Sequence, residues 1–298
     1  MRCWWLLVPG LLVACESGGS ATDAAVDEAA PRCDPAQPFG APRLVLGINT
    51  DADDATARLS PDETEIAFAR RTSGVWDLWR ATRAADDGPF ESPVLLTTVN
   101  SVSSDLWPSV SPDGLTVFFD ADRTTPGTFH IWRSTRSSTA VPFGPPMPRP
   151  ELMDRDLHPL VANQTALYLT STVRGGFGGA DLFRAALDPS GMIGAPVALV
   201  GGVNTAMDEE SPALTADERV IYFRRSDATL SDIYTASRST ATDGFGTSSP
   251  VPGLDVAGVG ETPNWVSPDN CRLYFHSNAD SGGGPAGLNV WMVTRPPT

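Results

Sequence analysis

The stretch Asp105-Leu-Trp-Pro-Ser-Val-Ser-Pro-Asp-Gly114 decides the fold, because the chain repeats it five times. In its clearest copy it continues through Thr116-Val-Phe-Phe119 and closes with His130-Ile-Trp-Arg-Ser-Thr-Arg136. Aligned on Ser111, the copies follow one another at spacings of 51, 51, 53 and 52 residues, at Ser60, Ser111, Ala162, Thr215 and Ser267. A regular period of this length indicates a repeat architecture, so the 298 residues form one closed domain rather than two unrelated ones.

Each copy offers four short runs that are typical of β-strands. The first leads into the Ser-Pro-Asp-Gly sequence, in which Pro and Gly favour a tight turn, although residues 163–165 and 216–218 depart from it. The second run is β-branched and aromatic, as in Val117-Phe-Phe119. The third carries one aromatic per copy, which we expect to pack between neighbouring sheets: Trp79, Trp132, Phe183, Tyr234 and Trp291.

The fourth run contains Pro, which favours an outer edge strand. It follows only the first four copies, as in Phe90-Glu-Ser-Pro93, because the chain stops soon after the fifth. The missing run stands at the front, as Phe39-Gly-Ala-Pro42 followed by Arg43-Leu-Val-Leu-Gly-Ile48. The sequence therefore predicts an all-β fold, a five-bladed β-propeller over residues 38–298. Its blades have four strands, and an N-terminal strand closes the last blade and the ring.

The repeat resembles the TolB-type, WD-repeat-like propellers of bacterial envelope proteins. The matching residues are the Ser-Pro-Asp-Gly turn at 111–114, Phe119, the Ile131-Trp132 pair and Arg136. The resemblance covers nearly all of the chain after residue 37 and implies a propeller located in the bacterial cell envelope.

An acidic residue stands six positions before each anchor of the repeat, at Asp54, Asp105, Asp156, Glu209 and Glu261. The fourth is ambiguous by one place because Glu210 adjoins Glu209. The innermost strand of a propeller lines its channel, so we expect the five acids to gather near one mouth. Three arrangements are compatible with this spacing. The carboxylates accept hydrogen bonds from the next blade, bind a cation such as Ca²⁺, or hold a basic or polyol ligand.

Residues 1–14 combine one Arg, a short apolar run and small residues, which is typical of a secretory signal peptide. Leu12-Val-Ala-Cys15 resembles the bacterial lipobox, and that resemblance implies lipidation of Cys15; plain secretion is the alternative. Residues 15–37 are small and acidic, and we expect a disordered tether. Cys33 and Cys271 then remain for one disulfide in an oxidising compartment, or as two buried thiols.

The formal net charge is −15, and all 21 basic residues are Arg. Such an acidic chain argues against nucleic acid and against electrostatic docking on anionic lipid. His130, His158 and His276 are scattered and match no metal or triad spacing. Three further acids open the third strand and have Arg in the preceding loops, so we expect loop-fixing ion pairs between Asp77, Asp181, Asp232 and Arg71, Arg174, Arg225.

A lipid anchor, a tether and a rigid multi-loop domain favour a binding or scaffolding module in the envelope. It would present a face to a protein, peptide or glycan as a monomer, with the membrane reached through the lipid alone. We assign no catalytic residues, and non-enzymatic function is favoured. The alternative is a glycoside hydrolase-like enzyme that uses two acids at the channel mouth at the separations such enzymes require. A Ser-His-Asp hydrolase is disfavoured because no Gly-x-Ser-x-Gly elbow occurs.

Overall fold

The computed structural model describes residues 32–226, 231–254, 259–279 and 285–298. The expected signal peptide, Cys15 and most of the expected tether lie outside these residues. Within them, no helix is long and apolar enough to cross a membrane. The strands form five four-stranded antiparallel sheets, and a short parallel pair of β14 (Gly201–Gly202) and β18 (Phe245–Thr247) lies beside them.

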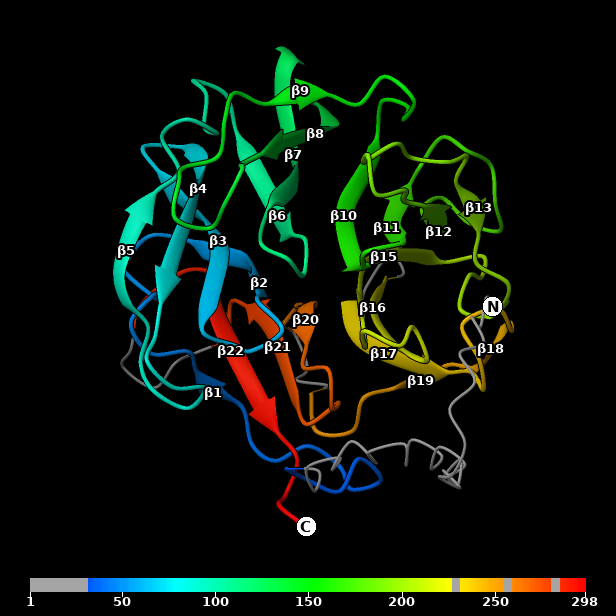
Figure 1. The fold of residues 1–298 in the computed structure, drawn as a ribbon. Helices are drawn as coiled ribbons and strands as arrows, with labels where there is room; N and C mark the ends of the chain where they lie inside the picture. The colour runs from blue at the N-terminus through cyan, green and yellow to red at the C-terminus, as the bar shows by residue number, and fades with distance from the viewer. Residues whose placement is uncertain (1–31, 227–230, 255–258, 280–284) are drawn as a thin grey trace, which may run out of the picture. The chain divides into compact units, whose positions relative to one another are not determined.

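The five sheets are the blades of a β-propeller, and the chain enters each at its innermost strand (Figure 1). Each inner strand contacts the inner strands of both neighbouring blades, so the ring is closed. The predicted five-bladed fold is therefore confirmed. From the inner strand outwards, the first blade is β2 (Asp54–Leu59), β3 (Glu65–Thr72), β4 (Val75–Thr82), β5 (Glu91–Leu95), and the second is β6 (Asp105–Val110), β7 (Thr116–Thr125), β8 (Thr128–Thr135), β9 (Met147–Pro148). The third blade is β10 (Asp156–Asn163), β11 (Ala166–Ser171), β12 (Asp181–Ala186), β13 (Val197–Ala198), and the fourth is β15 (Asp208–Leu214), β16 (Val220–Ser226), β17 (Ser231–Ser237), β19 (Ser249–Pro250). The fifth blade is β20 (Glu261–Val266), β21 (Arg272–Ser277), β22 (Asn289–Thr294), β1 (Arg43–Leu44).

The N-terminal strand β1 completes the last blade, as the count of fourth strands predicts. It pairs with β22 in antiparallel register, Arg43 opposite Met292 and Leu44 opposite Trp291. Phe39, just before β1, is buried in a core cluster with Trp291. The first and last segments of the propeller thus share one sheet, and this pairing closes the ring.

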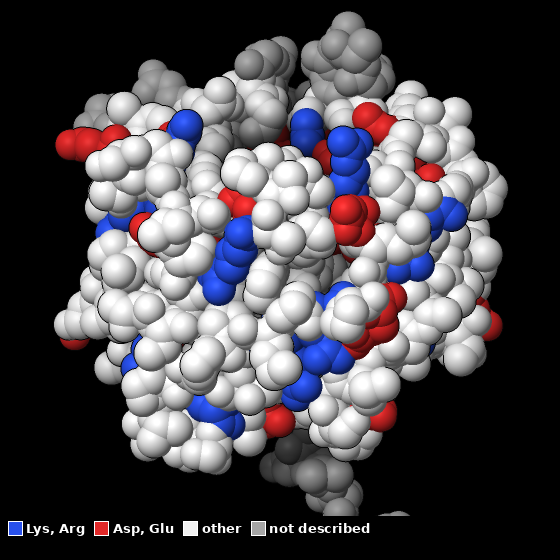
Figure 2. Space-filling model, turned by 90° about the horizontal axis from the view of Figure 1, so that it is seen from above, with Lys and Arg blue, Asp and Glu red and all other residues white. Residues whose placement is uncertain are grey.

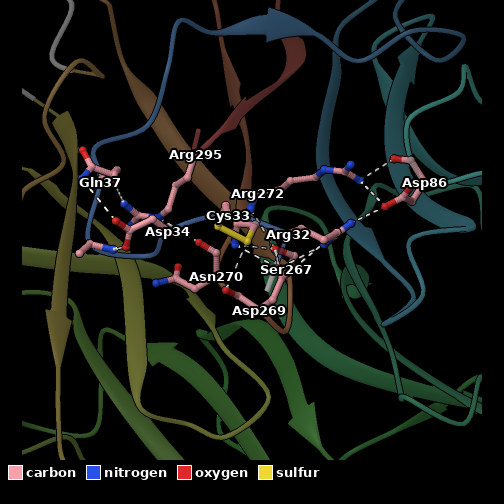
Figure 3. The surroundings of a disulfide bond; sticks show 12 residues. Arg32, Cys33, Asp34, Gln37, Asp86, Ser267, Asp269, Asn270, Arg272 and Arg295 are labelled. Carbon is pink, nitrogen blue, oxygen red and sulfur yellow. Dashed lines mark hydrogen bonds and ion pairs between the residues drawn. A yellow bond between two sulfur atoms is a disulfide. The ribbon is translucent and has the colours of Figure 1, made fainter. Parts of the chain in front are cut away.

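A disulfide between Cys33 and Cys271, the pairing expected from the sequence, secures this closure (Figure 3). Arg32 beside it donates to Asp269 at 2.7 Å and to Glu63 at 2.6 Å, which links the closing segment to the fifth and first blades. The backbone N–H of Asp34 donates to the carbonyl of Pro296. The compact unit therefore includes residues that precede the expected boundary at residue 38.

The hydrophobic core consists of side chains packed between adjacent blades, supplied mainly by the second and third strands. Phe68 of β3 packs with Trp265 and Tyr274 of the fifth blade, while Phe119 of β7 packs with Leu78 of the first. Every blade contributes apolar residues that are fully or almost fully buried. Blade-to-blade packing of this kind holds the inner strands in fixed positions around the channel.

Candidate functional site

The five repeated acids lie at the start of the inner strands and are buried: Asp54, Asp105, Asp156, Glu209 and Glu261. The acids of the first four blades each form an ion pair with an Arg of their own blade. Asp54 pairs with Arg70 at 2.6 Å and Glu209 with Arg225 at 2.8 Å, while Asp105 and Asp156 pair with Arg123 and Arg174. The same four carboxylates accept a backbone N–H from the loop before the strand, such as that of Thr50 at 2.8 Å.

These pairs are part of the blade, because in three of them the Arg also lies over the repeated aromatic residues. The guanidinium of Arg70 is 5.0 Å from the centroid of the Trp79 ring, and that of Arg225 is 4.5 Å from Tyr234. Burial raises the pKa of Asp54, and Arg70 opposes that rise. Acid, Arg and aromatic therefore form one interaction unit that joins the first three strands of a blade.

Two sequence expectations about these charges need correction. The carboxylates take their partners from their own blade and the loop before it, rather than from the next blade. The expected pair of Arg174 with Asp181 does not form among the described residues, because Arg174 binds Asp156 of the inner strand; Arg225 likewise binds Glu209 of the inner strand. Arg71 lies 3.6 Å from Asp53.

The ring of acids is poorly suited to bind a cation, because the oxygens of four carboxylates already accept hydrogen bonds from Arg side chains and backbone N–H groups. In the fifth blade, Ser277 stands opposite Glu261 across the strand pair. Within the residues that the structure describes, no group of three or more His, Cys, Asp or Glu could hold a metal ion. Acidic and basic side chains also lie together on the face shown in Figure 2, where neither sign covers a continuous area.

A register shift breaks the pairing of each inner strand with its second strand shortly after the acid. In four blades the shift includes the residue two positions after the acid, and in the fifth it falls one residue later, between Pro263 and Trp265. In four blades this residue has a positive φ between 53° and 58°, at Thr56, Trp107, His158 and Ser211; the fifth blade has Pro263 there. Positive φ is uncommon for residues other than Gly and often marks a functional position. The residue at this position differs in all five repeats.

Side chains of the preceding blade hold the bulges in place. The N–H of His158 donates to Asp120 Oδ2 at 2.8 Å, and the N–H of Ser211 donates to Thr170 Oγ1 at 3.1 Å. Asp120 and Thr170 occupy equivalent places on the second strands β7 and β11. His276, their equivalent on β21, accepts the N–H of Thr56 with Nδ1. The bulges are therefore built features, each matched by a polar residue next to it.

Trp107, His158 and His276 form a cluster on the inner side of the propeller, with one residue each from the second, third and fifth blades. The Trp107 ring centroid is 4.2 Å from that of His158 and 5.7 Å from that of His276. All three side chains are partly exposed, whereas the repeated acids are buried. We call these three residues the Trp–His cluster. His130, the third histidine, lies apart from it and contacts Asp154 at 3.2 Å.

Both imidazoles of the Trp–His cluster are neutral at physiological pH. Burial, helped by the charges of Arg58 and Arg224, lowers the pKa of His158 to about 3, and burial with Arg224 does the same for His276. Nδ1 of His276 lies 2.9 Å from the amide nitrogen of Asn264 and 3.5 Å from the backbone N–H of Thr56; both of these groups donate, which assigns the proton of the neutral ring to Nε2. Nδ1 of His158 lies 3.3 Å from both Ser211 Oγ and Thr170 Oγ1. The arrangement therefore presents uncharged rings, with Nε2 of His276 as a donor.

Beyond the cluster, Arg58 of β2 crosses the channel. Its Nη1 donates to the carbonyl of Asn264 at 2.7 Å and to that of Pro212 at 3.3 Å, on the fifth and fourth blades. The side chain is 3% exposed, and burial lowers its pKa to about 9 while the charge of Asp120 opposes the change. Arg58 thus ties the first blade to two others in the interior of the propeller.

Sequence reasoning missed the Trp–His cluster because its members are far apart and match no catalytic spacing. Two of them, Trp107 and His158, occupy the same register of the repeat, two residues after the acid. The recoverable signal was that this position carries a different residue in each of the five copies. His276 lies on the second strand of the fifth blade. It reaches the Trp–His cluster only because the fifth blade packs against the first.

No protein-family model and no curated protein matches the sequence. Solved structures match at the level of the fold. The GH43_1 enzyme from Xanthomonas citri has a TM-score of 0.59 at 15% identity, covering 84% of this chain and 90% of that one. The α-L-arabinofuranosidase PaAbf62A from Podospora anserina has a TM-score of 0.58 at 11% identity, covering 89% and 99%.

TolB from Acinetobacter baumannii also matches, with a TM-score of 0.49 at 15% identity over 83% of this chain. The match spans 55% of that TolB chain. The five-bladed β-propeller fold is therefore shared with glycoside hydrolases. Since this likeness concerns the fold alone, it is compatible with ligand binding and with catalysis, and the site itself must carry the functional argument.

Proposed function

We propose that the protein is a binding module of the bacterial envelope that holds an uncharged, hydroxyl-rich ligand, such as a glycan, against the Trp–His cluster. The observation that carries this proposal is the cluster itself, in which an aromatic ring and two neutral imidazoles are partly exposed on the inner side of the propeller. Binding sites typically combine apolar or aromatic surface with a few placed polar groups.

The chemistry of the cluster favours a neutral ligand over an ion. The indole of Trp107 offers an apolar face, and sugar rings present C–H groups that suit such a face. Nε2 of His276 offers a donor to a hydroxyl oxygen. The nearby Arg224 is paired with Glu210 at 2.8 Å, so these two charges largely cancel. A structure of similar fold, PaAbf62A, was solved in complex with cellotriose, which makes cellotriose a suitable first probe.

Glycoside hydrolysis is the second candidate function, because one carboxyl group near the cluster has the properties of a proton donor. Burial raises the pKa of Asp120 well above its usual range, and its Oδ1 is buried without a hydrogen-bond partner. A hydrolase also needs a second carboxylate. Burial raises the pKa of Glu210 as well, but Arg224 holds this side chain. Binding is therefore the better supported function.

An array of neutral and acidic oligosaccharides that includes cellotriose tests the proposal, with the fluorescently labelled full chain as the reporter. We expect a defined set of neutral glycans to bind, and Trp107→Ala to lose them. Trp132→Phe is the matched control, since this indole belongs to the repeated packing positions and lies outside the cluster. Release of reducing sugar from the bound glycans would instead establish the hydrolase. Absence of glycan binding would contradict the proposal and direct the search to peptides and proteins.

We also propose that the lipid on Cys15 keeps the module in the envelope, with the residues before 32 as its tether. The support is the sequence Leu12-Val-Ala-Cys15 alone. Cells that express the chain with a radiolabelled fatty acid should label it, and Cys15→Ser should abolish the label and release the protein from the membrane fraction. An unlabelled wild-type chain would exclude the anchor.

A further inference from the structure

A cavity lies at the other end of the inner strands, around the turns that follow them. Its volume is about 320 Å³, which is within the range of small-molecule sites. All five blades contribute to its wall, and most of the lining is aliphatic, aromatic or Pro, including Leu59, Val110, Leu160, Val161, Leu214, Trp265 and Val266. We call this cavity the funnel.

The funnel has one charged residue among those that line it, all of them in the described part of the chain, and that residue is Arg58. Two of its guanidinium nitrogens, Nε and Nη2, are buried and have no hydrogen-bond partner. A buried polar group without a partner costs free energy, and a buried charge costs more. Such an arrangement favours a ligand that supplies the missing acceptors.

The acceptors that the protein provides for Arg58 are carbonyl oxygens rather than a carboxylate. The charge of Asp120 acts on Arg58, but the two side chains form no ion pair within the residues that the structure describes. Burial also favours the protonated form of Asp120. A neighbouring pocket of about 420 Å³ also reaches Arg58, but it is less favourable for an anion, because three acids and one further Arg line it: Asp62, Glu65, Asp113 and Arg136. The funnel is therefore the side from which an anion can approach.

We propose that the funnel binds a small apolar anion, a straight-chain carboxylate of medium length. Its carboxylate would accept from the unpartnered nitrogens of Arg58, and its hydrocarbon chain would lie against the aliphatic wall. Charge-assisted hydrogen bonds between a guanidinium and a carboxylate are among the stronger ones in proteins. This site is distinct from the Trp–His cluster, so it does not depend on the proposed glycan binding.

Calorimetric titration of the full chain with butanoate, hexanoate, octanoate and decanoate tests this inference, with 1-octanol as the uncharged match for octanoate. We expect affinity to rise about fourfold per methylene until the funnel is filled. Octanol should bind at least tenfold more weakly than octanoate. Arg58→Met should lower octanoate affinity at least tenfold and leave octanol binding unchanged.

Two further variants keep the test decisive if Arg58→Met does not fold. Ala162→Trp narrows the funnel and leaves Arg58 in place, while Ala84→Trp adds the same side chain at an exposed loop position. We expect the first to weaken octanoate and octanol alike and the second to change neither. Equal binding of octanoate and octanol, or no binding of any of the four acids, would overturn the proposal. Binding only of a peptide with an apolar C-terminal residue would assign the funnel to a protein partner instead.

Discussion

Removing one repeated carboxylate should destabilise the propeller by a predictable amount, and Asp105→Asn is the clearest case. Asp105 is fully buried and accepts from Arg123 Nε at 2.9 Å and from the N–H of Ser101 at 2.8 Å. Breaking a buried pair by removing one charge costs about 3–5 kcal/mol. Arg123 keeps its bond to the carbonyl of Val99 and its contact with Trp132, so we expect the lower end, about 3 kcal/mol.

Thermal unfolding followed by circular dichroism measures this effect in the full chain. For a domain of this size, about 3 kcal/mol corresponds to a melting temperature roughly 6–12 °C lower. The double variant Asp105→Asn/Arg123→Met should be less destabilised than the sum of the two single variants, because the two side chains interact. A melting temperature within about 1 °C of wild type for Asp105→Asn, or strict additivity, would refute the structural role of the pair.

Three further predictions concern closure and the channel interior. Replacing both Cys33 and Cys271 by Ser should lower the unfolding free energy by about 2–4 kcal/mol and abolish any effect of reductant on the melting temperature; reductant sensitivity that persists would contradict this. The pKa of Asp120 is raised above 3.8, so the folded state retains a proton and stability falls as pH rises past 3.8. Asp120→Asn should remove that fall in urea unfolding measured from pH 4 to 8, and an unchanged pH slope would count against it. The pKa of His276 is lowered from 6.5 to about 3, so its contribution to stability is lost as pH falls below 6.5. The His276→Gln variant should lose less stability than wild type between pH 7 and 4, and equal losses would show that this ring is not held neutral.

The architecture could be predicted from the sequence because the residues of each repeat indicate the strands and turns of one blade. Five copies of the Ser111 motif fixed the number of blades, and the position of Phe39 before the first copy predicted the closing strand. The pairing of Arg43 with Met292 confirms this. Turn residues and apolar periodicity were sufficient to predict the blades, because each copy of the repeat shows the same pattern.

The candidate site was harder to predict because it depends on contacts between blades. A repeated acid such as Asp105 attracts attention in the sequence, yet its partner Arg123 makes it part of the scaffold. Trp107 and His276 are separated by most of the chain and meet only when the ring closes. The twist and register that bring them together arise from packing, so sequence spacing alone gives no sign of their proximity.

The central claim is that the repeated acids build the propeller while the Trp–His cluster binds the ligand. The most direct measurement is the oligosaccharide array read in parallel with wild type, Asp105→Asn and Trp107→Ala at a temperature where all three are folded. We predict that Asp105→Asn binds the same glycans as wild type despite its lower melting temperature, and that Trp107→Ala binds none. Retained binding by Trp107→Ala, or loss of binding by a folded Asp105→Asn, would contradict the account.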